Sequence, residues 1–296
     1  MIEWAVPPRR PLLRQPVALA ALAWLALAGL GAGCASLLAP AGPLAADTSR
    51  TFLPPGPGWL LGTDFLGRDV LARILWGGRS TLGMGLLALA VAVGAGLPVG
   101  LVAGTFGGWV DVLLMRLVDA LLAFPGLLLA MAIVALLGPG VSAVAVAVGV
   151  AAAPAYARVA RSAALEVRVQ PYVEAARAVG CTPWRIVVRH VLPNAAAPLV
   201  AFAATQLGWV LLNGAALTFL GLGAPPGTPE WGAMLAEGRG YLRDAPWVST
   251  FPGLALTLTV LAANLVGDGL QVALRVGSGG KGGKGRKGKE VGDRSR

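Results

Sequence analysis

Six long apolar stretches divide the sequence, and this alternation restricts the chain to a membrane fold. The stretches are residues 16–40, 81–102, 111–137, 141–164, 196–220 and 254–270. A helix needs about 20 mostly apolar residues to cross the hydrocarbon core of a bilayer. Composition agrees, because 56% of the residues are hydrophobic and only 13% are charged, whereas soluble domains carry about a quarter. The sequence therefore predicts an all-α membrane protein with six transmembrane helices.

The distribution of positive charge predicts the orientation of these helices. A net charge of +10 would suggest nucleic acid in a soluble protein, but Lys and Arg of a membrane protein gather on the cytoplasmic side. The arginines of segments expected inside are Arg158, Arg161, Arg168, Arg177, Arg185 and Arg189, and a basic tail follows. Four arginines of residues 41–80 oppose this trend. We expect both termini in the cytoplasm, contacts with bilayer lipid and no nucleic-acid partner.

A polar island at residues 171–193 has the signals of two short helices. Pro171 suits a first helical position, and Gly180 suits the left-handed residue that ends a helix. Tyr172, Ala175, Ala176 and Val179 recur at helical spacing and predict its apolar face. Thr182 and Pro183 begin a second helix that runs to Pro193. The pattern predicts a helix-turn-helix between two spans, with a shallow face that a partner could grip.

The spacing within this island resembles the EAA loop of permease subunits in binding-protein-dependent ATP-driven (ABC) importers. The matching residues are Glu174, Ala175, Ala176, Gly180, Leu192 and Pro193. His190 departs from the general pattern, but Arg189 to Asn194 resembles the dipeptide/oligopeptide branch. An ordinary amphipathic loop is the simpler alternative, and Glu-Ala-Ala alone would not exclude it.

Further segments resemble the same branch and cover most of residues 60–275. They are Leu61–Leu71, Met115–Pro125, Leu217–Leu235, Ala245–Gly253 and Asn264–Leu270. Taken as ordinary helix chemistry, Asp69 and Arg73 could pair along one helix, as could Arg116 and Asp119. Pro125 should kink the third span.

The resemblance implies a MetI-like type I ABC importer permease fold, with a cytoplasmic EAA coupling loop at residues 165–194. The implied partners are a second homologous permease subunit, two cytoplasmic ATPase subunits that bind ATP and Mg²⁺, and an extracytoplasmic solute-binding protein. The implied location is the bacterial inner membrane. Within the fifth span, Gln206 and Asn213 are the main polar residues. Polar groups at such depth usually face other helices or an aqueous path, so both are candidates for the translocation path.

The chain lacks the residues that several other classes of protein require. It has no ATPase motif, and His190 is its only histidine, so we expect neither catalysis nor a cofactor in this chain. Few charges lie in the spans, which argues against a proton-coupled carrier. A nickel or other small-solute permease of the same branch remains an alternative to a peptide permease. A passive channel or membrane scaffold is the alternative of a different class.

The expected organisation follows the apolar stretches. Residues 1–15 form a cytoplasmic N-terminus, 16–40 the first transmembrane helix and 41–80 an external segment. A cleaved signal peptide competes with the first helix, but the apolar run is longer than a signal core. Residues 81–275 form the five-helix permease core, and 276–296 a disordered basic cytoplasmic tail that we predict to be dispensable.

Overall fold

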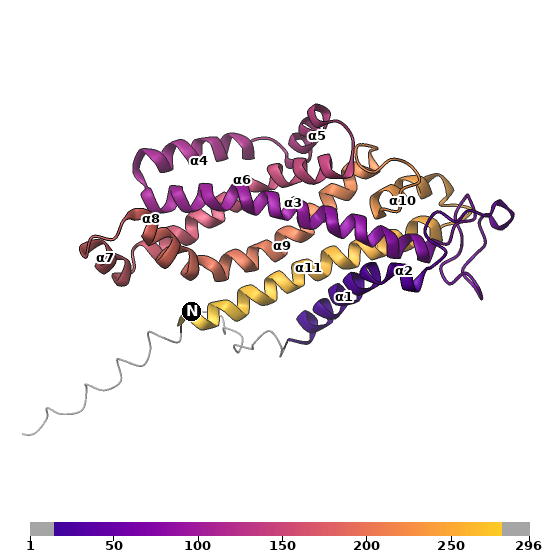
Figure 1. Ribbon diagram of the computed structural model, residues 1–296, viewed down its shortest axis with the longest axis horizontal. Helices are drawn as coiled ribbons and strands as arrows, with labels where there is room; N and C mark the ends of the chain where they lie inside the picture. Colours follow the sequence, from indigo (N-terminus) through magenta and orange to yellow (C-terminus); the bar gives the residue numbers. More distant parts are fainter. Residues whose placement is uncertain (1–14, 280–296) are drawn as a thin grey trace, which may run out of the picture.

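The computed structural model describes residues 15–279, and every regular element of this range that is longer than an isolated bridge is a helix (Figure 1). The α-helices are α1 (Pro16–Gly33), α2 (Ala35–Leu38), α3 (Val70–Phe106), α4 (Gly108–Leu122), α5 (Gly126–Leu137), α6 (Val141–Arg168), α7 (Pro171–Ala178), α8 (Pro183–Ile186), α9 (Leu192–Phe219), α10 (Trp231–Gly238) and α11 (Trp247–Gly279). Short turns η2 (Thr48–Arg50), η3 (Val187–Val191) and η4 (Arg239–Tyr241) complete the set.

The long helices run side by side along the molecule, and the polar segments gather at its two ends. Helices α3, α6, α9 and α11 follow the long axis in Figure 1. One end carries α7 and α8, and we call residues 165–194 the loop end. The opposite end carries α10 and the connection before α3, and we call residues 41–69 and 221–246 the cap end. The bundle thus separates two polar regions by the length of its helices.

Close contact between α3 and α6 forms the centre of the bundle. Gly96, Gly100 and Gly104 are spaced four residues apart near the end of α3. A side chain on Gly96 would overlap the backbone oxygen of Ala153, and one on Gly100 would overlap that of Ala157. Small residues let two membrane helices approach until their backbones touch. Around this seam lie Met84, Ala88, Val144 and Val148, all of them buried.

The third apolar stretch is broken rather than straight. Helices α4 and α5 meet at 90° across Ala123–Pro125, because Pro125 cannot donate the hydrogen bond that would continue the helix. Five helices are long and apolar enough to cross a membrane, and the bent pair makes a sixth if it counts as one span. The kink predicted at Pro125 is confirmed.

Several boundaries differ from the sequence-based prediction. Helix α3 begins at Val70, with Asp69 as its N-cap, so residues 70–80 belong to the same long helix as the predicted second span. The first helix ends at Gly33, before the short α2. The last helix continues to Gly279, which contradicts disorder at residues 276–279. Expectations for residues 1–14 and 280–296 lie outside the described residues.

Two charge pairs that the sequence allowed along single helices do not form. Arg73 bonds to Asp64 and Glu237, both from cap-end segments, instead of to Asp69. Asp119 pairs with Arg158 of α6 at 2.7 Å instead of with Arg116. In both cases the partner of opposite charge comes from another segment of the chain instead of from the same helix.

Candidate coupling site

Helix α7 ends in a turn that only a left-handed residue makes well. Gly180 has φ +83° and follows the C-cap Val179. The N–H of Gly180 donates to the Arg177 carbonyl at 2.9 Å, and the N–H of Cys181 donates to the Ala176 carbonyl at 3.0 Å. These two bonds make a Schellman motif. The predicted role of Gly180 in ending the helix is therefore confirmed.

The buried face of α7 is not the predicted one. Val173 and Ala176 are buried and join a core cluster that includes Tyr156, Ala160 and Leu199, whereas Tyr172, Ala175 and Val179 are exposed. The prediction for Ala176 holds and the other three are wrong. The difference arises because α7 packs beneath α6 and α9, which select the face that meets the core.

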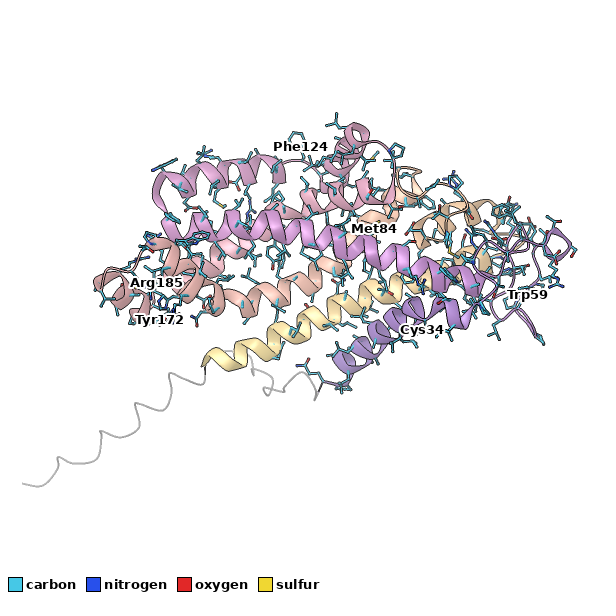
Figure 2. All side chains as sticks on the ribbon, in the orientation of Figure 1. Cys34, Trp59, Met84, Phe124, Tyr172 and Arg185 are labelled. Carbon is cyan, nitrogen blue, oxygen red and sulfur yellow. The ribbon has the colours of Figure 1, made fainter. Side chains whose placement is uncertain are left out.

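The exposed face of the loop end is unusually apolar for a surface. Val179 is 80% exposed and Trp184 is 64% exposed, and Tyr172 and Val188 are also open to solvent. Arg177, Arg185 and Arg189 lie among them, also exposed, and none of the three makes an ion pair within the described range. Figure 2 shows Tyr172 and Arg185 at this end. Large exposed apolar side chains with a polar rim are typical of a surface that binds another protein.

The six candidate coupling residues divide between this surface and the core. Glu174, Ala175, Gly180 and Pro193 are exposed, Ala176 is buried and Leu192 is half-buried. No neighbour lies within 4 Å of the position that a side chain on Gly180 would begin to occupy. The exposed members can therefore touch a partner, while Ala176 fixes α7 to the rest of the molecule.

The second helix of the predicted helix-turn-helix is the start of the next span. Thr182 caps α8 by accepting the N–H of Arg185 at 3.4 Å, which confirms the predicted N-cap. Helix α8 then passes through the π-helical turn η3 into α9, and the continuous run extends from Pro183 to Phe219. Pro193 cannot pair with a residue one turn earlier, and the wider π turn lies just before it. The second predicted helix and the fifth span are therefore one continuous helical run.

The two candidates for the translocation path lie two turns apart on α9. Gln206 is buried. Asn213 is half-buried and donates its amide to the Trp209 carbonyl at 2.9 Å.

Sequence reasoning missed an ion cluster at the cap end. Asp64 Oδ2 lies 2.6 Å from Arg68 Nε and 2.8 Å from one terminal nitrogen of Arg73. Glu237 Oε2 lies 2.9 Å from the same nitrogen of Arg73 and 3.2 Å from Arg68. Asp64 is fully buried and Arg73 is 1% exposed. The cluster is neutral overall, and its charges are paired as burial requires.

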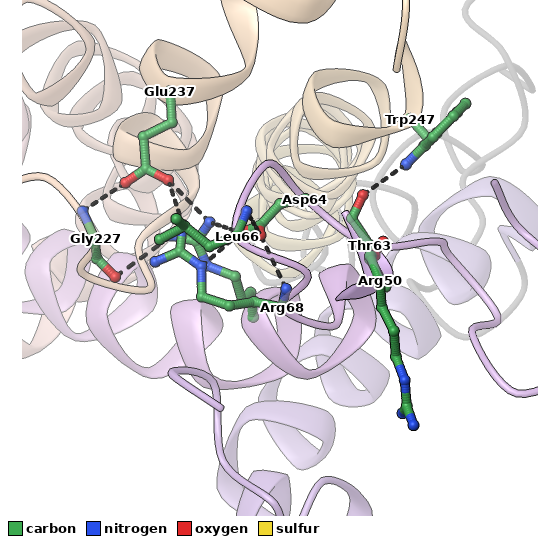
Figure 3. A network of polar contacts seen from close by, with 9 residues as sticks. Arg50, Thr63, Asp64, Leu66, Arg68, Gly227, Glu237 and Trp247 are labelled. Carbon is green, nitrogen blue, oxygen red and sulfur yellow. Dashed lines mark hydrogen bonds and ion pairs between the residues drawn. The ribbon is translucent and has the colours of Figure 1, made fainter. Parts of the chain in front are cut away.

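The same cluster joins three segments of the cap end (Figure 3). Glu237 of α10 also accepts the N–H of Gly227 at 2.6 Å, and Arg73 belongs to α3. Next to it, the indole N–H of Trp247 donates to the Thr63 carbonyl at 3.0 Å. The sequence did signal this region, since an otherwise apolar chain concentrates Asp and Arg at residues 64–73, but the partner Glu237 is far away along the chain.

A second buried carboxylate fixes the start of α10. Glu230 accepts a hydrogen bond from the Thr81 hydroxyl at 2.8 Å and from the N–H of Ala233 at 2.9 Å. Burial raises the pKa of Glu230 above its ordinary value, although hydrogen bonds from Gly232, Thr81 and Ala233 oppose this rise. The cap end is thus held by carboxylates at two places.

Most of the chain is similar in sequence to known transport proteins. Residues 96–275 match the family described as "Binding-protein-dependent transport system inner membrane component". The glutathione transport system permease protein GsiD of Pectobacterium atrosepticum is 46% identical over 228 residues, or 77% of this chain and 76% of that protein. The dipeptide transport system permease protein DppC of Alkalihalophilus pseudofirmus is 42% identical over 75% of this chain and 72% of its own length.

A Brucella relative and a solved structure agree with these matches. A putative peptide transport system permease protein of Brucella suis is 43% identical over 78% of both chains. A chain of the MetNI methionine ABC transporter, solved in inward-facing conformations, has a TM-score of 0.55 at 25% identity and matches 69% of this chain and 95% of its own. The MetI-like fold predicted from the sequence is therefore confirmed.

Proposed function

Because the chain belongs to the family of binding-protein-dependent transport system inner membrane components, we propose that it is the permease subunit of an ATP-driven importer of short peptides. The names of the relatives support the class of solute, since they are permeases for glutathione, dipeptides and peptides. We propose that a solute-binding protein delivers the peptide outside the membrane. A second, homologous permease subunit would form the other half of the path.

The exposed loop end is the observation that carries the mechanism. Residues 165–194 would bind an ATPase subunit, with Glu174, Ala175 and Gly180 in contact with it. Burial of one large apolar side chain contributes about 1.5–3 kcal/mol, so the exposed Val179 and Trp184 would favour docking. ATP and Mg²⁺ would bind to the ATPases, and this chain would need no cofactor of its own.

The movement of the docked ATPases would reach the spans through the loop end. Ala176 and Val173 fasten α7 to the core, and α8 continues into α9. Closure of the ATPases on ATP would shift both elements and change the path from inward-open to outward-open. Gln206 and Asn213 of α9 would then meet the solute.

Substitution of Gly180 tests the coupling role. The site has room for a side chain, and a left-handed residue with a Cβ costs roughly 1 kcal/mol, so Gly180→Arg should fold and enter the membrane. It should nevertheless lose most ATPase binding and abolish peptide uptake, because the long side chain blocks the docking surface. Glu174→Lys should weaken binding less. Co-purification of the ATPase and uptake at equal membrane abundance measure both effects.

A matched control separates the effect of side-chain volume at position 180 from the effect of backbone strain. Gly180→Ala has the same unfavourable φ but almost no added volume, so it should retain far more ATPase binding than Gly180→Arg. Normal binding and uptake by Gly180→Arg would reject the coupling site.

The orientation of the chain needs its own test. We propose that the loop end and both termini face the cytoplasm of a bacterial cell. In a background with Cys34→Ser and Cys181→Ser, an impermeant thiol reagent should label Gly240→Cys from outside and Ala178→Cys only after permeabilisation. Both positions are exposed, so the opposite pattern would reverse the proposed topology.

A further inference from the structure

A small pocket beside the loop end has the chemistry of an anion site. It measures about 250 Å³ and is lined by Thr105, Phe106, Arg168, Arg177, Cys181, Pro183 and Ile186. These residues come from the end of α3, the end of α6, and the segment from α7 to α8. No carboxylate is among the lining residues.

The two arginines of the pocket keep most of their hydrogen-bond donors unpaired, although the charge of Asp111 interacts with Arg168. Neither Arg168 nor Arg177 forms an ion pair within residues 15–273, and Arg168 makes one long hydrogen bond there, at 3.4 Å to the Gly104 carbonyl. The guanidinium of Arg168 packs directly over Gly107. Most of the donors of both side chains are therefore available, and guanidinium groups bind phosphate and carboxylate oxygens in pairs of hydrogen bonds.

A buried hydroxyl in the same pocket also lacks a partner. Thr105 is more than nine-tenths buried, and its Oγ1 has no hydrogen-bond partner among the described atoms. An unpaired buried polar group costs free energy until a ligand or water satisfies it. Thr105 thus points independently to a polar ligand in this pocket.

The surroundings favour a ligand from the membrane surface. Phe106 in the pocket and Trp109 on the adjoining turn are exposed, and aromatic residues with arginine are typical of a membrane–water interface. Basic pockets at such positions bind anionic lipid headgroups. Apolar walls from Pro183 and Ile186 would strengthen each charge interaction.

We propose that this pocket binds a phosphate oxyanion, either the phosphodiester headgroup of an anionic lipid or free phosphate. Arg168 and Arg177 donate to the phosphate oxygens, and the Thr105 hydroxyl donates to a third. The ligand would link α7 to the ends of α3 and α6 and hold the loop end in one position. The site does not depend on which face of the membrane the loop end occupies.

The reactivity of the Cys181 thiol can show whether the pocket is occupied, because Cys181 lines the pocket. The full chain with Cys34→Ser is placed in nanodiscs of phosphatidylcholine, in nanodiscs that also contain phosphatidylglycerol, and in phosphatidylcholine nanodiscs with inorganic phosphate. The reaction rate of Cys181 with a neutral maleimide is measured in each. A ligand at about ten times its Kd should slow the reaction about tenfold. Protection by phosphatidylglycerol alone identifies a lipid site, and protection by phosphate as well identifies a general phosphate site.

Three variants decide whether the pocket is responsible. Arg177→Gln and Thr105→Val should abolish protection, and neither breaks a hydrogen bond present among the described residues. Arg189→Gln should retain it, because Arg189 is exposed at the same end but lies outside the pocket. Thermal unfolding in phosphatidylcholine nanodiscs verifies that each variant is folded.

Two outcomes would overturn the proposal. Equal loss of protection in Arg189→Gln would assign the effect to general surface charge. Absence of protection both with phosphatidylglycerol and with inorganic phosphate would show that the pocket is not a phosphate site.

Discussion

The two ends of the molecule treat charged side chains in opposite ways. At the cap end, Asp64, Arg68, Arg73 and Glu237 pair with one another almost out of contact with water. At the loop end, Arg177, Arg185 and Arg189 are exposed and have no acidic partner within the described part of the chain. The cap end therefore pairs its buried charges with one another, whereas the loop end leaves its charges and apolar side chains for another molecule.

This contrast separates stability from function. A change at the cap end should first alter folding, because breaking a buried pair leaves an uncompensated charge. A change on the surface of the loop end should first alter binding, since exposed side chains contribute little to the folded chain. Three substitutions test this division, beginning with the largest expected effect.

Asp64→Asn should damage the cap end most. The change leaves Arg68 and Arg73 with Glu237 as their only carboxylate, at a cost of roughly 3–5 kcal/mol in the free energy of unfolding. Thermal or denaturant unfolding of the chain in nanodiscs measures this loss of stability. Asp47→Asn is the matched control, because Asp47 also pairs with an arginine, Arg50 at 3.0 Å, but both are exposed. Equal effects of the two changes would show that the buried cluster is not a source of stability.

Glu230→Gln should change how stability depends on pH. The folded pKa of Glu230 lies above the ordinary value of 4.5, so the folded chain holds this proton more tightly than the unfolded chain does. The resulting stability is present below pH 4.5 and is lost as the pH rises through the folded pKa. The free energy of unfolding, measured across this pH window, should decline less with rising pH in Glu230→Gln than in the original chain. Parallel pH profiles would mean that Glu230 is not desolvated.

Trp184→Ser should have the smallest effect on folding. The side chain is largely exposed, so the free energy of unfolding should change by about 0.5 kcal/mol or less, while ATPase co-purification should fall clearly. Ile186→Ser, two residues away, is the contrasting control because Ile186 is buried and loss of such a side chain costs about 2–5 kcal/mol. If Trp184→Ser destabilised the chain as much as Ile186→Ser, the loop surface would belong to the core.

Local signals in the sequence predicted the parts of the fold that depend on neighbouring residues. Gly180, Thr182 and Pro125 each set the backbone by their own chemistry, and the structure has the predicted turn, cap and kink at these positions. The apolar stretches likewise predicted the helices, since length and hydropathy are properties of one segment.

Features that depend on distant segments were predicted poorly. Pro, Gly and mixed charges suggested an external segment up to residue 80, yet a long helix begins at Val70, where Asp69 caps it. The carboxylates that pair with Arg73 of this helix come from Asp64 and Glu237. The buried face of α7 was misassigned, since packing against other helices chose Val173. Among the candidate site residues, the spacing located Glu174 and Gly180, which are exposed, and Ala176, which is buried against the core. It placed Ala175 on the same face as Ala176, whereas Ala175 is exposed.

The continuous helical run from Pro183 to Phe219 connects the loop end rigidly to the opposite end of the fifth span. Its 37 residues at 1.5 Å each give a rod of about 55 Å. If such a rod pivots near Pro183, a tilt of about 5° moves the other end by about 5 Å, which is close to one helical turn. A displacement at Trp184 too small to disturb the Schellman turn would thus be magnified by the time it reaches Asn213.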